Sequence, residues 1–147
     1  MKLSLFTNNI EEYLQKDAII DYEIDIENTT GDLEQVINGS LSQMSTSRIK
    51  VALENRTVVN DENPMLVNPT YFSELEIFPA SNEKEGFVLH KTSISGNDAD
   101  YYRLYMWIPE VDREGNELSI SQTGENSISN QAFSIQINVQ AIGKNKS

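Results

Sequence analysis

The feature that most constrains this chain is a repeated alternation of apolar and polar residues with a period of two. The clearest case lies near the C-terminus, where polar residues separate Phe133, Ile135, Ile137 and Val139. In the run 20–27, Ile and Tyr alternate in the same way with Asp and Glu. Side chains of a strand point alternately to its two faces, so this period predicts strands with one apolar face.

Shorter runs of the same kind lie at residues 49–53, 71–78, 87–89 and 101–108. Gly, Asn, Asp and Pro separate them, and residues 60–69 are expected to form a loop. No rhythm of strands and long helices, as in βαβ units, is present. About seven short strands predict an all-β, mainly antiparallel fold, with a β-sandwich or jelly-roll-like arrangement.

One short helix is expected near the N-terminus, at residues 8–18. Asparagines precede it, two glutamates fill its first turn, and its apolar residues follow helical spacing. Residues 32–37 fit either a helical turn or a strand, and Asn38-Gly39 is a strong turn signal.

A length of 147 residues fits one domain with a proper core, so residues 1–147 are expected to be a single domain. Within it, residues 1–9 are a candidate extended arm, and 143–147 are expected to be a disordered tail. The chain has no cysteine, which excludes disulfides and thiol chemistry. No apolar stretch approaches the ~18 residues of a membrane-spanning helix.

The net charge of −12 argues against binding to nucleic acid or to anionic membranes, because both require a positive surface. Seven acidic residues and no Lys or Arg lie between Asp17 and Ser47. A solubilising face is the simplest interpretation. The alternatives are binding of a divalent cation and docking onto a basic partner.

No catalytic motif is present, so an enzyme is not expected. His90 is the only histidine, and it follows an apolar run typical of a strand, which favours a structural role. The sequence contains no Gly-x-Ser-x-Gly elbow, no His-Glu-x-x-His zinc motif and no phosphate-binding loop.

Calcium is the one cofactor that the sequence suggests. Two oxygen-rich segments carry the hard ligands that calcium prefers, with Asp61 and Glu62 in one and Asp98 and Asp100 in the other. Neither segment has EF-hand spacing. Both also have the composition of ordinary turns.

One side of the run 101–108 carries Tyr101, Arg103, Tyr105 and Trp107. If this side faces outward, its composition is that of a protein-binding hot spot or a sugar-stacking platform. The alternative is a central strand whose two faces are both covered.

The run DYYRLYMWIPE at 100–110, a polar loop, and AFSIQINVQA at 132–141 together resemble a pattern in exported β-proteins of Gram-positive bacteria, the TasA and camelysin-like family. The Leu-Phe-Thr at 5–7 resembles the start of such a mature chain. The resemblance covers roughly 50 of the 147 residues. A helix directly after residue 9 would depart from the family pattern.

This resemblance implies a jelly-roll-like protein of the cell surface or biofilm matrix that polymerises by strand donation. The donor would include residues 1–9, in which Leu3, Leu5 and Phe6 are the apolar candidates, and the acceptor would be a sheet edge of the next subunit. The N-terminal apolar run is too short for a signal-peptide core. Either the protein is not exported by this route, or the sequence is a mature form.

The leading expectation is therefore a non-catalytic structural or interaction protein outside the cell or on its surface. Its partners would be copies of itself or other surface proteins. One alternative is a carbohydrate- or calcium-binding accessory module. Another is a phage-encoded acidic virion protein, or an inhibitor that docks the acids of segment 17–34 onto a basic partner.

Overall fold

The computed structural model describes residues 2–6, 18–58, 60, 62–79, 84–95, 98–120 and 127–146. Strands dominate these residues, and their pairings are antiparallel apart from one short ribbon. The predicted all-β, mainly antiparallel class is thereby confirmed. Positions 8–17 of the predicted N-terminal helix lie outside the described residues, and Ala18 already belongs to a strand.

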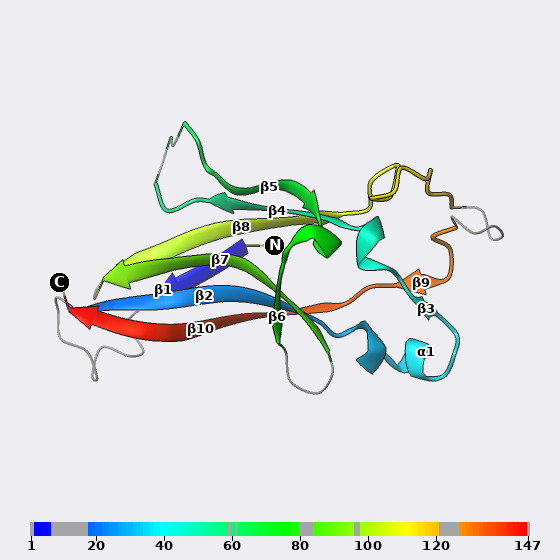
Figure 1. The fold of residues 1–147 in the computed structure, drawn as a ribbon, viewed down its shortest axis with the longest axis horizontal. Coiled ribbons are helices and arrows are strands. Elements are labelled where there is room, and N and C mark those ends of the chain that lie inside the picture. The colour runs from blue at the N-terminus through cyan, green and yellow to red at the C-terminus, as the bar shows by residue number, and fades with distance from the viewer. Residues whose placement is uncertain are drawn as a thin grey trace.

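Two four-stranded sheets and a small ribbon form the fold (Figure 1). The first sheet, in spatial order, contains β1 (Lys2–Phe6), β8 (Ala99–Trp107), β4 (Lys50–Asn55) and β5 (Met65–Tyr71). The second contains β10 (Ile135–Lys146), β2 (Ala18–Asn28), β7 (Glu85–Ser95) and β6 (Glu76–Pro79). The ribbon pairs β3 (Ser42–Gln43) in parallel with β9 (Gln131–Ala132).

Both sheets contribute to one apolar core. From β2 it receives the buried alternate residues Ile20, Tyr22, Ile24 and Ile26, as the period of two predicts. From the first sheet it receives Val51, Leu53, Tyr102 and Leu104. Apolar area from two sheets is thus removed from water in a single cluster, which is the main favourable term in folding.

Short helical turns connect the strands and are four residues long at most. They are η2 (Thr30–Asp32), α1 (Glu34–Ile37), η3 (Thr46–Arg48) and η4 (Phe72–Glu74). Of the two structures considered for 32–37, the helical turn is correct. Gly39 ends it with φ = +83°, a left-handed conformation that favours glycine. Among the described helices, none has the length and apolar character needed to cross a membrane.

In the middle of the chain, segments 60–69 and 71–78 differ from the sequence-based expectation. The loop predicted at 60–69 ends early, because β5 begins at Met65 and includes Pro69. Proline lacks a backbone donor and is tolerated on an edge strand, which is the place of β5 in its sheet. The strand predicted at 71–78 is divided by η4, where Phe72 turns into the core with no exposed surface.

The C-terminal residues expected to form a disordered tail, 143–147, are instead paired as far as Lys146. Residues 143–146 form ladder pairs with 18–21 of β2, after a bulge between Ala141 and Gly143. Ser147 lies outside the described residues. The long β10–β2 ladder carries the pairing to the end of the strand.

The acidic side of β2 is less exposed than its composition suggests. Asp25 is fully buried and Glu23 nearly so, although both lie on the side of β2 away from the core. Gln140 of β10 donates hydrogen bonds to Asp25 at 2.6 Å and to Glu23 at 3.4 Å, and Lys91 of β7 lies 3.6 Å from Glu23. The expectation of a solvated acidic face is therefore wrong at these two positions.

Candidate functional site

The aromatic side of β8 faces outward. Tyr101 is 40% exposed, and Tyr105 and Trp107 are each 37% exposed, with the half-buried Arg103 between them. The sequence left open whether this side of the strand is exposed or covered. In the structure it is exposed, although β8 lies between β1 and β4. The first sheet presents these rings in a row on its outer face.

Hydrogen bonds hold the central ring of this row. Tyr105 donates from its hydroxyl to Glu54 Oε2 at 2.7 Å, and Arg56 Nη1 donates to Glu54 Oε1 at 2.6 Å. These two bonds lower the pKa of Glu54, so the carboxylate stays ionised. Tyr105 is paired with Ala52, a small residue that is almost fully buried in β4.

Burial changes abruptly along the opposite, core-facing side of β8. Tyr102 and Leu104 are buried, but Met106 is 42% exposed, and beyond the strand Ile108 is 44% exposed. The neighbouring strand β1 pairs only with residues 99–103 of β8. Apolar side chains are therefore left open where the core ends.

An apolar pocket of about 410 Å³ lies at this end of the core. Its walls come from the end of β8, the segment between β3 and β4, and β9 with the residues that follow it. The lining residues are Met44, Ile49, Met106, Trp107, Ile108, Gln131 and Phe133. Met44 and Ile49 are buried and form part of the core cluster, so the pocket is a continuation of the core.

Among the described lining residues, Gln131 has the one polar side chain, and Arg48 fixes its orientation. Arg48 Nη1 donates to Gln131 Oε1 at 3.0 Å and to the backbone oxygen of Ser127 at 3.0 Å. A guanidinium group only donates, so the amide oxygen must face Arg48. The amide NH₂ group of Gln131 is then the part left for a ligand.

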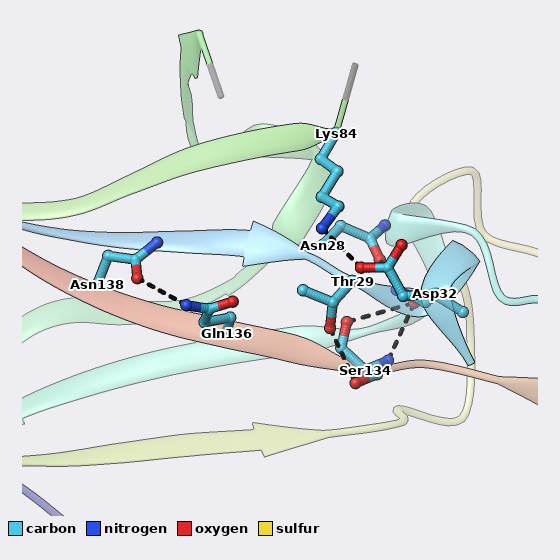
Figure 2. A network of polar contacts seen from close by, with 8 residues as sticks. Asn28, Thr29, Asp32, Lys84, Ser134, Gln136 and Asn138 are labelled. Atoms are coloured by element: carbon cyan, nitrogen blue, oxygen red, sulfur yellow. Dashed lines mark hydrogen bonds and ion pairs between the residues drawn. The ribbon is translucent and has the colours of Figure 1, made fainter. Parts of the chain in front are cut away.

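A network of hydrogen bonds joins the end of β2 to Ser134, the residue after Phe133 of the pocket wall (Figure 2 shows the network). Thr30 is fully buried; its hydroxyl donates to Asn28 Oδ1 at 2.6 Å and accepts from the backbone nitrogen of Ser134 at 3.0 Å. The Thr29 hydroxyl bonds the Ser134 hydroxyl at 2.9 Å. These contacts tie the end of β2 to the residue after Phe133. The ion pair of Lys84 with Asp32, at 2.6 Å, closes the outer side of this turn.

The candidate assembly arm forms β1 at the edge of the first sheet. It runs antiparallel to β8, with Leu3 opposite Tyr102, Leu5 opposite Asp100 and Phe6 opposite Ala99. The arm is thus an intramolecular edge strand, and it pairs with the half of β8 that lies away from the pocket.

The four calcium candidates do not form a cluster among the described residues. Asp61 lies outside them, and Glu62 is an exposed loop residue. Asp98 is exposed, whereas Asp100 accepts a 2.5 Å hydrogen bond from the Tyr22 hydroxyl. Within the described part of the chain, no three His, Asp or Glu residues come together as a metal site.

His90 lies in strand β7, as the sequence predicts, with its ring edge-on to Tyr102 at 6.0 Å between centroids. Desolvation lowers the pKa of His90, and the charge of Asp100 partly opposes this effect. The imidazole is therefore neutral at pH 7. The ring is half-buried against Tyr102.

The pocket was not anticipated from the sequence. Its residues come from positions 44–49, 106–108 and 131–133, which no local pattern connects. The one available signal was the apolar run Met106-Trp107-Ile108 directly before Pro109, which continues past the end of a strand. Apolar residues that continue past the end of a strand can line a pocket instead of packing against a neighbouring strand.

In comparisons with known proteins, no family model, no curated protein and no solved structure matches this chain.

Proposed function

We propose that this protein is a non-catalytic interaction protein that assembles with copies of itself by exchange of strand β1. The supporting observation is the position of β1, an edge strand of five residues that, among the described strands, pairs only with β8. An edge strand has one row of unpaired backbone groups, and exchange of an identical element between subunits is a low-cost route to assembly. The resemblance of segments 100–110 and 132–141 to exported surface proteins points to the bacterial surface or matrix as the place of assembly.

The connection of β1 to the rest of the chain permits such an exchange. Residues 7–17 join it to β2, which belongs to the other sheet. If fully extended, these eleven residues could span about 36–40 Å, which is the upper limit on the reach of β1 from β2. In the neighbour, β1 would meet the same edge of β8 and form the same five ladder pairs, so exchange sacrifices little pairing energy.

Disulfide trapping tests this proposal, because the chain has no cysteine of its own. Ser4 lies opposite Tyr101 in the β1–β8 ladder. When the single variants Ser4→Cys and Tyr101→Cys are mixed at high concentration and oxidised, we expect a disulfide-linked dimer. Neighbouring Cα atoms of a ladder lie within the range that a disulfide bridges.

Two controls make the trapping specific. Mixing Ser4→Cys with Asn138→Cys, which lies on β10 of the other sheet, should give no dimer. The double variant Ser4→Cys/Tyr101→Cys should form an intramolecular bond that blocks assembly, seen by light scattering and negative-stain microscopy. Equal cross-linking of both mixtures, or assembly that survives both the intramolecular bond and deletion of residues 1–9, would rule out strand exchange.

The outward row of aromatic rings supports a second candidate, carbohydrate binding. Exposed rings stack on the apolar faces of sugars, and the half-buried Arg103 lies on the same side of β8, between Tyr101 and Tyr105. Depletion of the protein by insoluble polysaccharides, compared with a Tyr105→Ala/Trp107→Ala variant, tests it. Depletion that is the same for both proteins would exclude this surface.

A further inference from the structure

The apolar pocket at the end of β8 has the properties of a small-molecule site. Its volume of about 410 Å³ lies within the ~300–1,000 Å³ typical of such sites. It is lined by apolar side chains with one polar group, Gln131, which is also the usual composition. None of its residues belongs to β1 or pairs with it, so the pocket is independent of strand exchange.

The polar group of the pocket wall selects the chemistry of a ligand. Arg48 occupies the amide oxygen of Gln131, and among the described residues no group accepts a hydrogen bond from the amide nitrogen. A ligand that reaches Gln131 must therefore supply an acceptor. A ligand with only a donor would leave the NH₂ group unpaired, which costs binding energy.

The apolar walls select the shape of the ligand body. Trp107 and Phe133 contribute aromatic rings, and Met44 and Met106 contribute flexible thioethers. Methionine sulfur packs favourably against aromatic rings, and its unbranched side chain adapts to them. Together these walls suit a flat, apolar ring system.

We propose that this pocket binds a small, flat, apolar molecule that carries one hydrogen-bond acceptor, such as an aromatic ketone. The acceptor contacts the amide NH₂ of Gln131, and the rings lie among Met44, Met106 and Phe133. Trp107 and Ile108, which are partly exposed, form the mouth.

The chain carries its own reporters for this site. Trp107 is the single tryptophan, so intrinsic tryptophan fluorescence reports on the pocket mouth alone. Two of the four methionines, Met44 and Met106, line the pocket, whereas Met65 lies in β5 and does not. In a protein with ¹³C-labelled methionine methyl groups, Met65 is therefore an internal control.

The test compares two probes of the same shape, 2-acetylnaphthalene and 2-ethylnaphthalene. We expect saturable shifts of the Met44 and Met106 methyl signals, a change in Trp107 fluorescence and an unchanged Met65 signal. The ketone should bind roughly 2- to 13-fold more tightly than the hydrocarbon, the range for one hydrogen bond. Methyl shifts that do not saturate, or that affect Met65 equally, would contradict binding of the probes in this pocket. Equal affinity for the two probes would overturn the role of the acceptor.

Three variants separate the parts of the proposal. Gln131→Leu should bind both probes equally, because it removes the donor and keeps an apolar wall. Ile108→Glu should reduce binding at least tenfold by placing a charge at the mouth. Leu66→Glu, at a similarly exposed position of β5, should bind both probes as the unmodified chain does. If Ile108→Glu does not fold, Met106→Gln replaces it. Unchanged binding by the folded mouth variant contradicts the proposal.

Discussion

Tyr22 and Asp100 join the two sheets through a hydrogen bond of 2.5 Å, donated by the Tyr22 hydroxyl to Oδ2 of Asp100. Tyr22 lies in β2 of one sheet, and Asp100 lies in β8 of the other. The Tyr22 hydroxyl also forms a buried hydrogen bond with the hydroxyl of Tyr102, which lies in β8. Burial, with the bonds to Asp100 and Tyr102, raises the pKa of Tyr22, so the phenol remains a neutral donor.

The substitution Tyr22→Phe should lower the free energy of unfolding by about 1–3 kcal/mol. It removes the donor and leaves the Asp100 carboxylate and the Tyr102 hydroxyl without this partner between the sheets. Urea denaturation measures the change. Tyr101→Phe, at an exposed position of the same β8, is the matched control and should cost less than about 0.5 kcal/mol. Equal effects of the two substitutions would show that the inter-sheet bond adds no stability.

Asp25 should make the stability of the protein depend on pH. Burial raises its pKa to about 6; the hydrogen bond from Gln140 opposes the rise and the nearby Glu23 adds to it. The other charged group facing this pair is Lys91, which also contacts Glu76 of β6. The folded state therefore binds the proton of Asp25 more tightly than the unfolded chain, in which the pKa is about 4. Protonated Asp25 therefore contributes its full stabilisation below about pH 4, and this contribution is lost as the pH rises through about 6.

The variant Asp25→Asn tests this dependence. Compared with the variant, the unmodified chain should lose on the order of 1 kcal/mol more of its unfolding free energy between pH 5 and pH 7. Urea denaturation at pH 5, 6 and 7 measures the difference. Glu114→Gln removes an exposed acid and should keep the pH dependence of the unmodified chain. If Asp25→Asn also keeps it, the buried carboxyl is not the group that titrates.

Local alternation predicted the strands well where one face of a strand meets the core. Ile20 to Ile26 in β2 and Ile135 and Ile137 in β10 follow the period of two and lie on the core side. Burial of Glu23 and Asp25 was not predictable in this way. It depends on Gln140 and Lys91, which pairing with β10 and β7 brings to β2 from distant positions.

The candidate sites also divide into features that local sequence predicted and features that depend on distant residues. The outward row of rings on β8 was identified as a set, because Tyr101, Tyr105 and Trp107 are spaced by two or four residues. Which face would be covered depended on the neighbours of β8 and could not be read from its residues. The pocket depends on three distant segments: the β3–β9 ribbon brings 131–133 beside Met44, and the pairing of β4 with β8 brings Met106 and Trp107 beside the start of β4.

Removal of the Thr30 hydroxyl should weaken the turn that supports Phe133. Thr30→Val keeps the shape and β-branching of the side chain but removes the bonds to Asn28 Oδ1 and from the Ser134 backbone nitrogen. A loss of about 1–3 kcal/mol in unfolding free energy is expected for a fully buried hydroxyl. Thr70→Val, the same change on the edge strand β5, should cost less than about 0.5 kcal/mol. Thermal or urea unfolding of the two variants decides whether the network stabilises the fold.

Phe72 should be among the most sensitive core positions, because it joins the two sheets and the pocket wall. Its ring meets Phe87 of β7 edge-on at 5.9 Å and Phe133 at 5.4 Å between centroids. Phe72→Ala should lower the unfolding free energy by about 3–5 kcal/mol, since a fully buried ring leaves a cavity that its neighbours fill only in part. Phe72→Leu refills most of that volume and should cost clearly less. Phe72→Ala also removes the ring that packs against Phe133. The Met44 methyl signal should therefore shift in this variant, while the Met65 signal should not. An unchanged Met44 signal would show that Phe72 does not support the pocket wall.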